Sequence, residues 1–299
     1  MKLFDCTLYY NEDLILETRL NILNKYFDKF IICESKYTHS GKKKKLNFDI
    51  KKFSEFKSKI IYITQDSEPD NLTYNHNNNS IEDPQNWRGN AVKRIAHQRN
   101  ALLDSVNHFA DPNDFVFYSD NDEIPNMENF DTLKETSKII FFEQKLFYYK
   151  FNLLCDRIFW YGTRAVKKKN LSDFEWLRNI KPKKYSYYRL DTLFKDNKYI
   201  SVKIIPNGGW HFTRILSPEE IHEKELIAEH HDEYRASNKN PDIIRDLIKR
   251  RMIDHNHLAD KKDSKYESEF KLTLYDLVNL PFYIKNNPKK YQDYLDLDT

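Results

Sequence analysis

The segment of residues 114–126, DFVFYSDNDEIPN, joins a short unbroken apolar run to a cluster of acids. Its apolar part, residues 115–118, is aromatic and β-branched, which is typical of a strand buried on both faces of a parallel sheet. The acids follow at the carboxyl end of this strand, and open α/β sheets bind their ligands at that end. The segment therefore predicts an α/β fold with a ligand site beside the acids.

Two of these acids, Asp120 and Asp122, have the spacing that places both side chains on one side of an extended backbone. Carboxylate oxygens suit Mg²⁺ or Mn²⁺, and these ions commonly carry a diphosphate. A solvated acidic turn is the alternative, because Asp296 and Asp298 have the same spacing without a preceding strand, where chains usually fray. The strand before Asp120, and Pro125 after the acids, favour a metal and phosphate site.

The pattern of the first half predicts a mixed, mostly parallel central sheet with flanking helices. The expected strands are residues 3–10, 30–33 and 60–63, the expected helices are 13–27 and 91–106, and 65–86 is an expected loop. In the second helix, Val92 and Ile95 have the spacing of residues that face the sheet. This alternation of strands and helices is typical of nucleotide-binding α/β domains.

Composition narrows the class of protein. The chain has 299 residues, 39% of them hydrophobic, which suffices for one large α/β domain. Its net charge of +3 gives no overall case for a nucleic-acid partner or an anionic membrane. With 5 glycines, the chain contains neither GxGxxG nor GxxxxGKS/T, which argues against a Rossmann dinucleotide site and a P-loop.

Four consecutive lysines, Lys42 to Lys45, form the most basic run of the first half. Such a run is usually a solvated loop, and its alternatives here are contact with phosphate, with an acidic acceptor or with a membrane surface as a peripheral partner. Cys6, Cys33 and Cys155 lie in apolar contexts and are odd in number, which predicts reduced core thiols. Since no stretch approaches the about 20 apolar residues of a membrane span, and the start does not resemble a signal peptide, we expect a cytoplasmic protein without a transmembrane segment.

Aromatic strands are expected after the acidic turn, within residues 138–149, 157–166 and 199–205. They predict a mixed sheet and a cleft wall, whose aromatic side chains either form core or stack on sugar rings. His211 follows two glycines and a tryptophan, and it is either a structural histidine or a third metal ligand with Asp120 and Asp122. Ser217 and Glu220 form a predicted capping box, and Glu219 beside them is a candidate general base.

Taken together, seven motifs resemble glycosyltransferase family 17, whose animal members are the bisecting β-1,4-mannosyl-glycoprotein N-acetylglucosaminyltransferases. These motifs are FDCTLYYNEDLILETRLNILNKYFDKFIICES, THSGKKKKLNF, QRNALL, FYSDNDEIP, GGWHF, SPEEI and LPFYIKNNPKKY. The resemblance implies a GT-A type fold, a nucleotide-sugar donor, a divalent metal on the Asp-x-Asp motif, and inversion at the anomeric carbon. The chain departs from the family at Ile95, where an acid is usual, and we expect it to be without the membrane anchor of the animal members.

Carried over by position, the resemblance implies that Asp120 and Asp122 hold the metal and that Glu123 is the acid after the motif. Glu123 thereby joins Glu219 as a candidate catalytic base. The residues assigned to donor binding are Asp120, Asn121, Asp122, Glu34, Arg99 and Lys44. The assigned metal ligands are Asp120, Asp122 and His211.

The predicted function is transfer of GlcNAc or a related hexose from a UDP-sugar to a glycan acceptor, with Mn²⁺ or Mg²⁺ and with inversion. The alternatives are a metal-dependent nucleotidyl or phosphoryl transferase, which would use the same acids, and a carbohydrate-binding protein without catalysis. We expect a single domain over 1–299. Its predicted parts are a nucleotide-sugar half at 1–126, an acceptor and metal-completing half at 127–260, and a C-terminal helical extension at 261–299.

Overall fold

The computed structural model describes residues 1–74, 82, 84–186, 188–257 and 268–297. Its strands are β1 (Leu3–Tyr9), β2 (Lys29–Ser35), β3 (Ile60–Gln65), β4 (Phe115–Tyr118), β5 (Glu123–Pro125), β6 (Ile139–Tyr148), β7 (Leu153–Trp160), β8 (Arg164–Lys167), β9 (Val202–Thr213), β10 (Met252–Ile253), β11 (Phe270–Lys271) and β12 (Thr273–Leu274). Its α-helices are α1 (Asp13–Leu23), α2 (Trp87–Asn100), α3 (Leu102–Phe109), α4 (Phe174–Asn179), α5 (Pro218–Glu225), α6 (His231–Ala236), α7 (Pro241–Lys249), α8 (Phe282–Asn286) and α9 (Pro288–Tyr291). Its 3₁₀ helices are η1 (Ile50–Phe56), η2 (Pro84–Asn86), η3 (Met127–Asn129), η4 (Lys168–Asn170), η5 (Leu190–Leu193), η6 (Leu277–Asn279) and η7 (Gln292–Tyr294).

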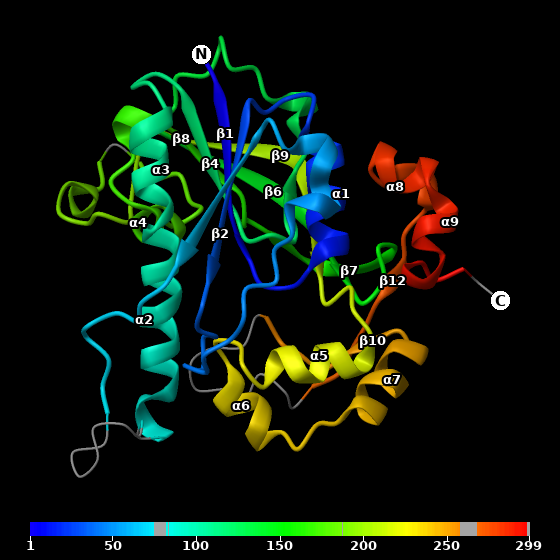
Figure 1. Cartoon of the computed structure of the whole chain (residues 1–299). Helices are drawn as coiled ribbons and strands as arrows, with labels where there is room; N and C mark the ends of the chain where they lie inside the picture. Colours follow the sequence, from blue (N-terminus) through cyan, green and yellow to red (C-terminus); the bar gives the residue numbers. More distant parts are fainter. Residues whose placement is uncertain (75–81, 83, 187, 258–267, 298–299) are drawn as a thin grey trace.

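One mixed sheet forms the centre of the molecule (Figure 1). Its main path runs β12, β7, β6, β8, β4, β1, β2, β3, and β9 joins it through β6 and β5 through β9. β3, β2, β1 and β4 pair in parallel, as do β6 and β9. The other pairs are antiparallel. The predicted mixed α/β sheet is confirmed, but it is mostly parallel only in its first half, because short connections such as residues 149–152 between β6 and β7 reverse the chain.

Helices cover both faces of the sheet, with α1, α8 and α9 on one side and α2, α3 and α4 on the other (Figure 1). Leu20 of α1 packs in one core cluster with Ile284 of α8. Val106 of α3 packs in a second cluster with Leu177 of α4. The side chains of β4 alternate between these clusters and are fully buried, so the predicted strand at residues 115–118 is confirmed.

The helices differ from their predicted bounds. The helix expected at 13–27 ends at Leu23, although Phe27 remains in the core as predicted. The helix expected at 91–106 is two helices, α2 and α3, separated by Ala101. Val92 was wrongly expected to face the sheet: it is 41% exposed, because other positions, among them Ala91 and Ile95, form the buried face of α2.

Three further expectations concern burial and the ends of the chain. Cys6, Cys33 and Cys155 are buried and form no disulfide, as predicted. Within the described ranges, no helix is both long and apolar enough to cross a membrane. Part of the loop expected at 65–86, namely 75–81 and 83, lies outside the described residues.

The C-terminal segment is attached to the sheet rather than frayed. β12 pairs with β7, and the carboxylate of Asp296 accepts hydrogen bonds from Arg251 at 2.8 and 2.9 Å. The backbone N–H of Asp296 also donates to Asn152 Oδ1 at 2.8 Å. The expectation that Asp296 lies in a frayed end is therefore wrong, and Asp298 lies outside the described residues.

A fully buried arginine, Arg19 of α1, connects the helix to β1 and to the acidic turn. Its guanidinium donates to both carboxylate oxygens of Asp5, at 2.6 and 2.8 Å. It also donates to Ser119 Oγ and to three carbonyl oxygens of residues 120–123, at 2.7–3.3 Å. Because a buried charge is stable only when it is paired and hydrogen-bonded, these contacts fix the path of the turn after β4.

We predict that Arg19→Leu lowers the free energy of unfolding by about 3–5 kcal/mol, because the substitution leaves Asp5 buried without its counter-ion. The double variant Asp5→Leu with Arg19→Leu is expected to lose less than the sum of the two single variants, since neither charge is then left alone. Urea unfolding followed by circular dichroism measures both.

The matched control is Arg245→Leu, which removes an arginine from an exposed ion pair with Glu219. We expect a change within about 0.5 kcal/mol. Equal losses in Arg19→Leu and Arg245→Leu would contradict the structural importance of Arg19.

Candidate active site

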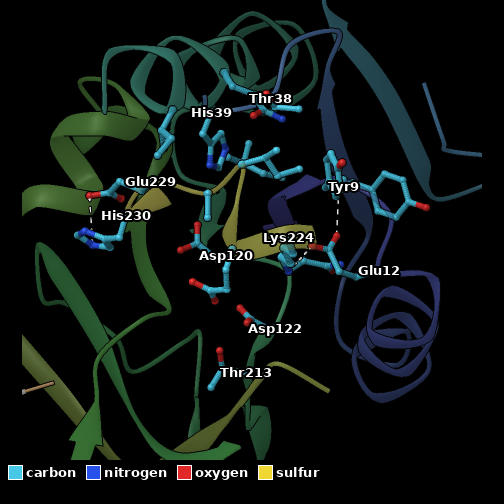
Figure 2. A pocket seen from close by; sticks show the side chains of 18 of the residues that line it. Tyr9, Glu12, Thr38, His39, Asp120, Asp122, Thr213, Lys224, Glu229 and His230 are labelled. Carbon is cyan, nitrogen blue, oxygen red and sulfur yellow. Dashed lines mark hydrogen bonds and ion pairs between the residues drawn. The ribbon is translucent and has the colours of Figure 1, made fainter. Parts of the chain in front are cut away.

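A cavity of about 370 Å³ opens at the carboxyl ends of β1, β2 and β4. One wall comes from these strand ends, from the loop after β2 and from α2. The facing wall comes from the end of α5 and the residues that follow it, up to His230 (Figure 2). The cavity therefore lies where the sequence predicts a ligand site, beside the acids that follow β4.

Asp120 lines this cavity, as predicted, and is shared between two arginines. Its Oδ2 accepts from Arg178 at 2.9 Å and its Oδ1 from the Tyr118 hydroxyl at 3.1 Å, while Arg99 lies 3.9 Å away. Burial raises the pKa of Asp120, but Arg178 and Arg99 outweigh this effect and hold the pKa well below its usual range. Asp120 is consequently an anion at neutral pH.

Asp122 also lines the cavity, and its side chain is 24% exposed. Its Oδ2 lies 3.4 Å from Nε2 of His211. Burial works against both charges, but their mutual attraction lowers the pKa of Asp122 and raises the pKa of His211. His211 itself does not belong to the cavity wall, and its buried Nδ1 has no hydrogen-bond partner among the described residues.

The two carboxylates allow a test of whether the site fits a divalent metal. In the part of the chain that the structure describes, no group of three His, Cys, Asp or Glu side chains is placed to hold an ion, so Asp120, Asp122 and His211 are not assembled as a set of three ligands. Mg²⁺, however, commonly takes one or two carboxylates and completes its shell with water and substrate phosphates. Asp120 and Asp122, both on the cavity wall, fit an ion held in that way.

Asn121, between these acids, is 7% exposed and lines the cavity. Neither its amide nitrogen nor its amide oxygen has a partner among the described residues. Buried amides are normally hydrogen-bonded. The side chain is therefore placed to bond a ligand, consistent with its predicted role in donor binding.

Glu123, a predicted general base, is buried and lies outside the cavity wall. Its carboxylate accepts from Trp160 Nε1 at 2.6 Å, from Arg178 at 3.1 and 3.2 Å, and from the backbone N–H of Asp120 at 2.9 Å. A Cβ added at Gly162 would lie 2.1 Å from its Cδ, so the backbone also closes over the carboxylate. This geometry favours a role in shaping the turn.

Glu219, the second predicted base, is in the first turn of α5 with its side chain 56% exposed. It pairs with Arg245 and does not line the cavity. The predicted capping box of Ser217 and Glu220 beside it is present. The position of Glu219 is thus that of a surface residue at a helix start.

Glu34 and Lys44, both predicted to bind the donor, form one ion pair, in which only Lys44 lines the cavity. Glu34 is fully buried and accepts from the backbone N–H groups of Asn47 and Phe48 at 2.8 and 3.0 Å. It therefore fixes the loop after β2 and the direction of Lys44. Of the four lysines in that loop, Lys42, Lys43 and Lys45 are exposed.

Arg99 lines the cavity as predicted, and its guanidinium donates to the Tyr118 hydroxyl at 2.9 Å and to Glu175 at 2.8 Å. Sequence reasoning missed its neighbour Arg178, which contacts Asp120 from 58 positions along the chain. It also missed Lys224, which lines the cavity and donates to Glu12. Glu12 lies within the family-like motif at the chain start, but no local pattern pairs it with Lys224.

Sequence similarity to known proteins identifies the family of the chain. No protein of curated function matches the chain. A sequence model of glycosyltransferase family 17 matches residues 1–296. The match confirms the predicted resemblance and leaves the nucleotidyl transferase and the non-catalytic binding protein without support. Because it covers nearly the whole sequence, the chain belongs to glycosyltransferase family 17 and is a hexosyltransferase.

Proposed function

We propose that the protein transfers GlcNAc or a related hexose from a UDP-sugar to a glycan acceptor, with inversion at the anomeric carbon and with Mn²⁺ or Mg²⁺. The observation that carries the proposal is the placement of Asp120, Asn121 and Asp122 together on the cavity wall, at the end of a buried parallel strand. A parallel β3-β2-β1-β4 unit with a ligand site at its carboxyl ends is consistent with a GT-A type fold.

Asp120 and Asp122 would hold the ion, and the ion supplies a positive charge that stabilises the diphosphate as it departs. In the transfer, the bond between the sugar C1 and the diphosphate oxygen breaks, and its electron pair stays on the diphosphate. The acceptor oxygen forms the new bond to C1 from the opposite face, and its proton passes to a base. This base must lie within reach of the acceptor hydroxyl, on the cavity wall.

Glu229 is our candidate for this base. Among the glutamates that the described residues contribute to the cavity wall, Glu12 is paired with Lys224 and Glu225 with Arg214. Glu229 instead lies 3.7 Å from His230 Nε2. Because none of the described lysines or arginines pairs with it, its carboxylate can bond an acceptor hydroxyl without breaking such a pair, which favours Glu229 over the other two glutamates. We also propose a cytoplasmic location, which the unpaired thiols of the three cysteines support.

The proposed metal requirement predicts that the affinity for UDP depends on the divalent cation. We expect the Kd of UDP to rise by about tenfold or more when EDTA removes the cation, because two carboxylates and a diphosphate then repel one another. Isothermal titration calorimetry in Mn²⁺ and in EDTA measures it. Uridine, which lacks the diphosphate, serves as the control, and equal UDP affinity in both buffers would refute the metal bridge.

The assignment of Asp122 predicts that Asp122→Asn lowers kcat by about 100-fold or more, because asparagine keeps the shape but loses the charge that holds a hard cation. The matched control, Asp131→Asn, removes an exposed acid outside the cavity and should change kcat by less than about twofold. UDP-sugar turnover at saturating Mn²⁺ is measured beside the melting temperatures of both variants. Full activity in folded Asp122→Asn would remove Asp122 from the site.

The assignment of the base predicts that Glu229→Gln lowers kcat by about 100-fold or more, with KM for the donor nearly unchanged, because only proton transfer is lost. Glu219→Gln, in the exposed first turn of α5, should keep wild-type turnover within about twofold. Steady-state kinetics over a range of donor concentrations separates kcat from KM. The reverse result, with loss in Glu219→Gln alone, would return the role to Glu219.

A further inference from the structure

Lys224, at the end of α5, is a cation on the cavity wall. It lies far along the chain from the acidic motif at residues 120–123. Its Nζ lies 2.5 Å from Oε1 of Glu12, at the start of α1. Figure 2 shows Lys224 beside Glu12, on the side that faces Asp120 and Asp122. The ammonium group interacts electrostatically with Asp122, one of the two acids proposed to hold the metal.

The position of Lys224 is fixed from both walls of the cavity. Oε2 of Glu12 accepts from the backbone N–H groups of Tyr10 and Asn11, at 3.1 and 3.2 Å. The carboxylate therefore cannot turn away without losing two hydrogen bonds, and its other oxygen stays directed at Lys224. On the lysine side, the backbone N–H of Ser40 donates to the carbonyl of Ile227 at 3.1 Å, which ties the residues after α5 to the loop after β2.

The charge of Lys224 is secure at neutral pH. Burial lowers its pKa, but Glu12 and Asp122 outweigh burial and raise the pKa above its usual value. An ammonium has three N–H donors, and among the described residues Glu12 is the acceptor that bonds it. The remaining donors are available to an anion in the cavity.

We propose that Lys224 binds the diphosphate of the nucleotide-sugar donor and stabilises the negative charge that builds on it as the sugar leaves, and that Glu12 is the residue that positions Lys224. The inference rests on the proposed function, because it takes the diphosphate donor from there. Beside the proposed metal ion, it adds a second positive charge, supplied by Lys224 at the end of α5. Fixed cations aimed at developing charge are a common source of rate acceleration.

The alternative is that the Glu12–Lys224 pair only fastens α5 to α1. A fastening role affects every ligand of the cavity to the same degree, whereas a diphosphate-binding role affects only ligands that carry phosphate. Uridine, UMP and UDP therefore distinguish the two roles, since they share one nucleoside and differ in phosphate.

The test is calorimetry of these three ligands in Mn²⁺ with wild type, Lys224→Met, Lys224→Gln and Lys224→Arg. We expect both neutral variants to raise the Kd of UDP by about tenfold or more and to leave the Kd of uridine within about twofold. Lys224→Arg, which keeps the charge, should retain most of the preference for UDP. Lys134→Met, at a lysine that is 86% exposed, is the matched control and should bind like wild type.

Turnover gives a second readout. In Glu12→Gln, the fold decrease in kcat should exceed the fold change in the Kd of uridine. The reason is that Lys224 keeps its charge but loses its fixed position. If the neutral variants weaken uridine and UDP equally, or leave both unchanged, the inference is overturned while the proposed function stands. If wild type itself binds UDP no better than uridine, the proposed donor fails and the inference fails with it.

Discussion

The buried ion pair of Arg19 and Asp5 is the interaction on which the site depends. A buried ion pair is stable only when nearly all of its hydrogen-bonding groups have partners. Arg19 donates to the carboxylate of Asp5, to the hydroxyl of Ser119 and to carbonyl groups of the turn after β4. A turn bound to a buried charge has little freedom to move. The acids of the motif are thereby presented to the cavity by a rigid backbone, which lowers the entropic cost of binding a ligand.

Like charges gathered at one turn would repel, and the structure balances them with cations from distant parts of the chain. Arg178 of α4 contacts Asp120 and Glu123, and His211 of β9 contacts Asp122. These contacts offset part of the negative charge of the turn before any ligand binds. A metal ion bound as proposed would compete with Arg178 for Asp120, and with the nearby His211 and Lys224 for Asp122.

Local features were predictable from the sequence, and long-range pairings were not. Three predicted features depend only on residues close together in the sequence, and the structure contains them. They are the strand at residues 115–118, the acids after it, and the capping box at Ser217. The burial of Glu123 depends on Trp160, 37 positions away, and on the close approach of Gly162, which periodicity does not encode. The same limit applies to Lys224 and Glu12, which meet across 212 positions.

The two walls of the cavity are stabilised by different kinds of ion pair. The acidic turn is stabilised by the fully buried Arg19. The wall after α5 contacts the rest of the chain through partly exposed ion pairs. Two of these join Lys224 to Glu12, and Arg88 of α2 to Asp232 of α6. Exposed or partly exposed pairs contribute about 1 kcal/mol or less each, far below the cost of breaking a buried one. The wall that carries the acids is thus held mainly by a buried charge, and the wall that carries Lys224 and Glu229 mainly by partly exposed ion pairs and by backbone hydrogen bonds such as that from Ser40 to Ile227. Such an asymmetry suits a cavity that admits a donor and an acceptor and releases both products.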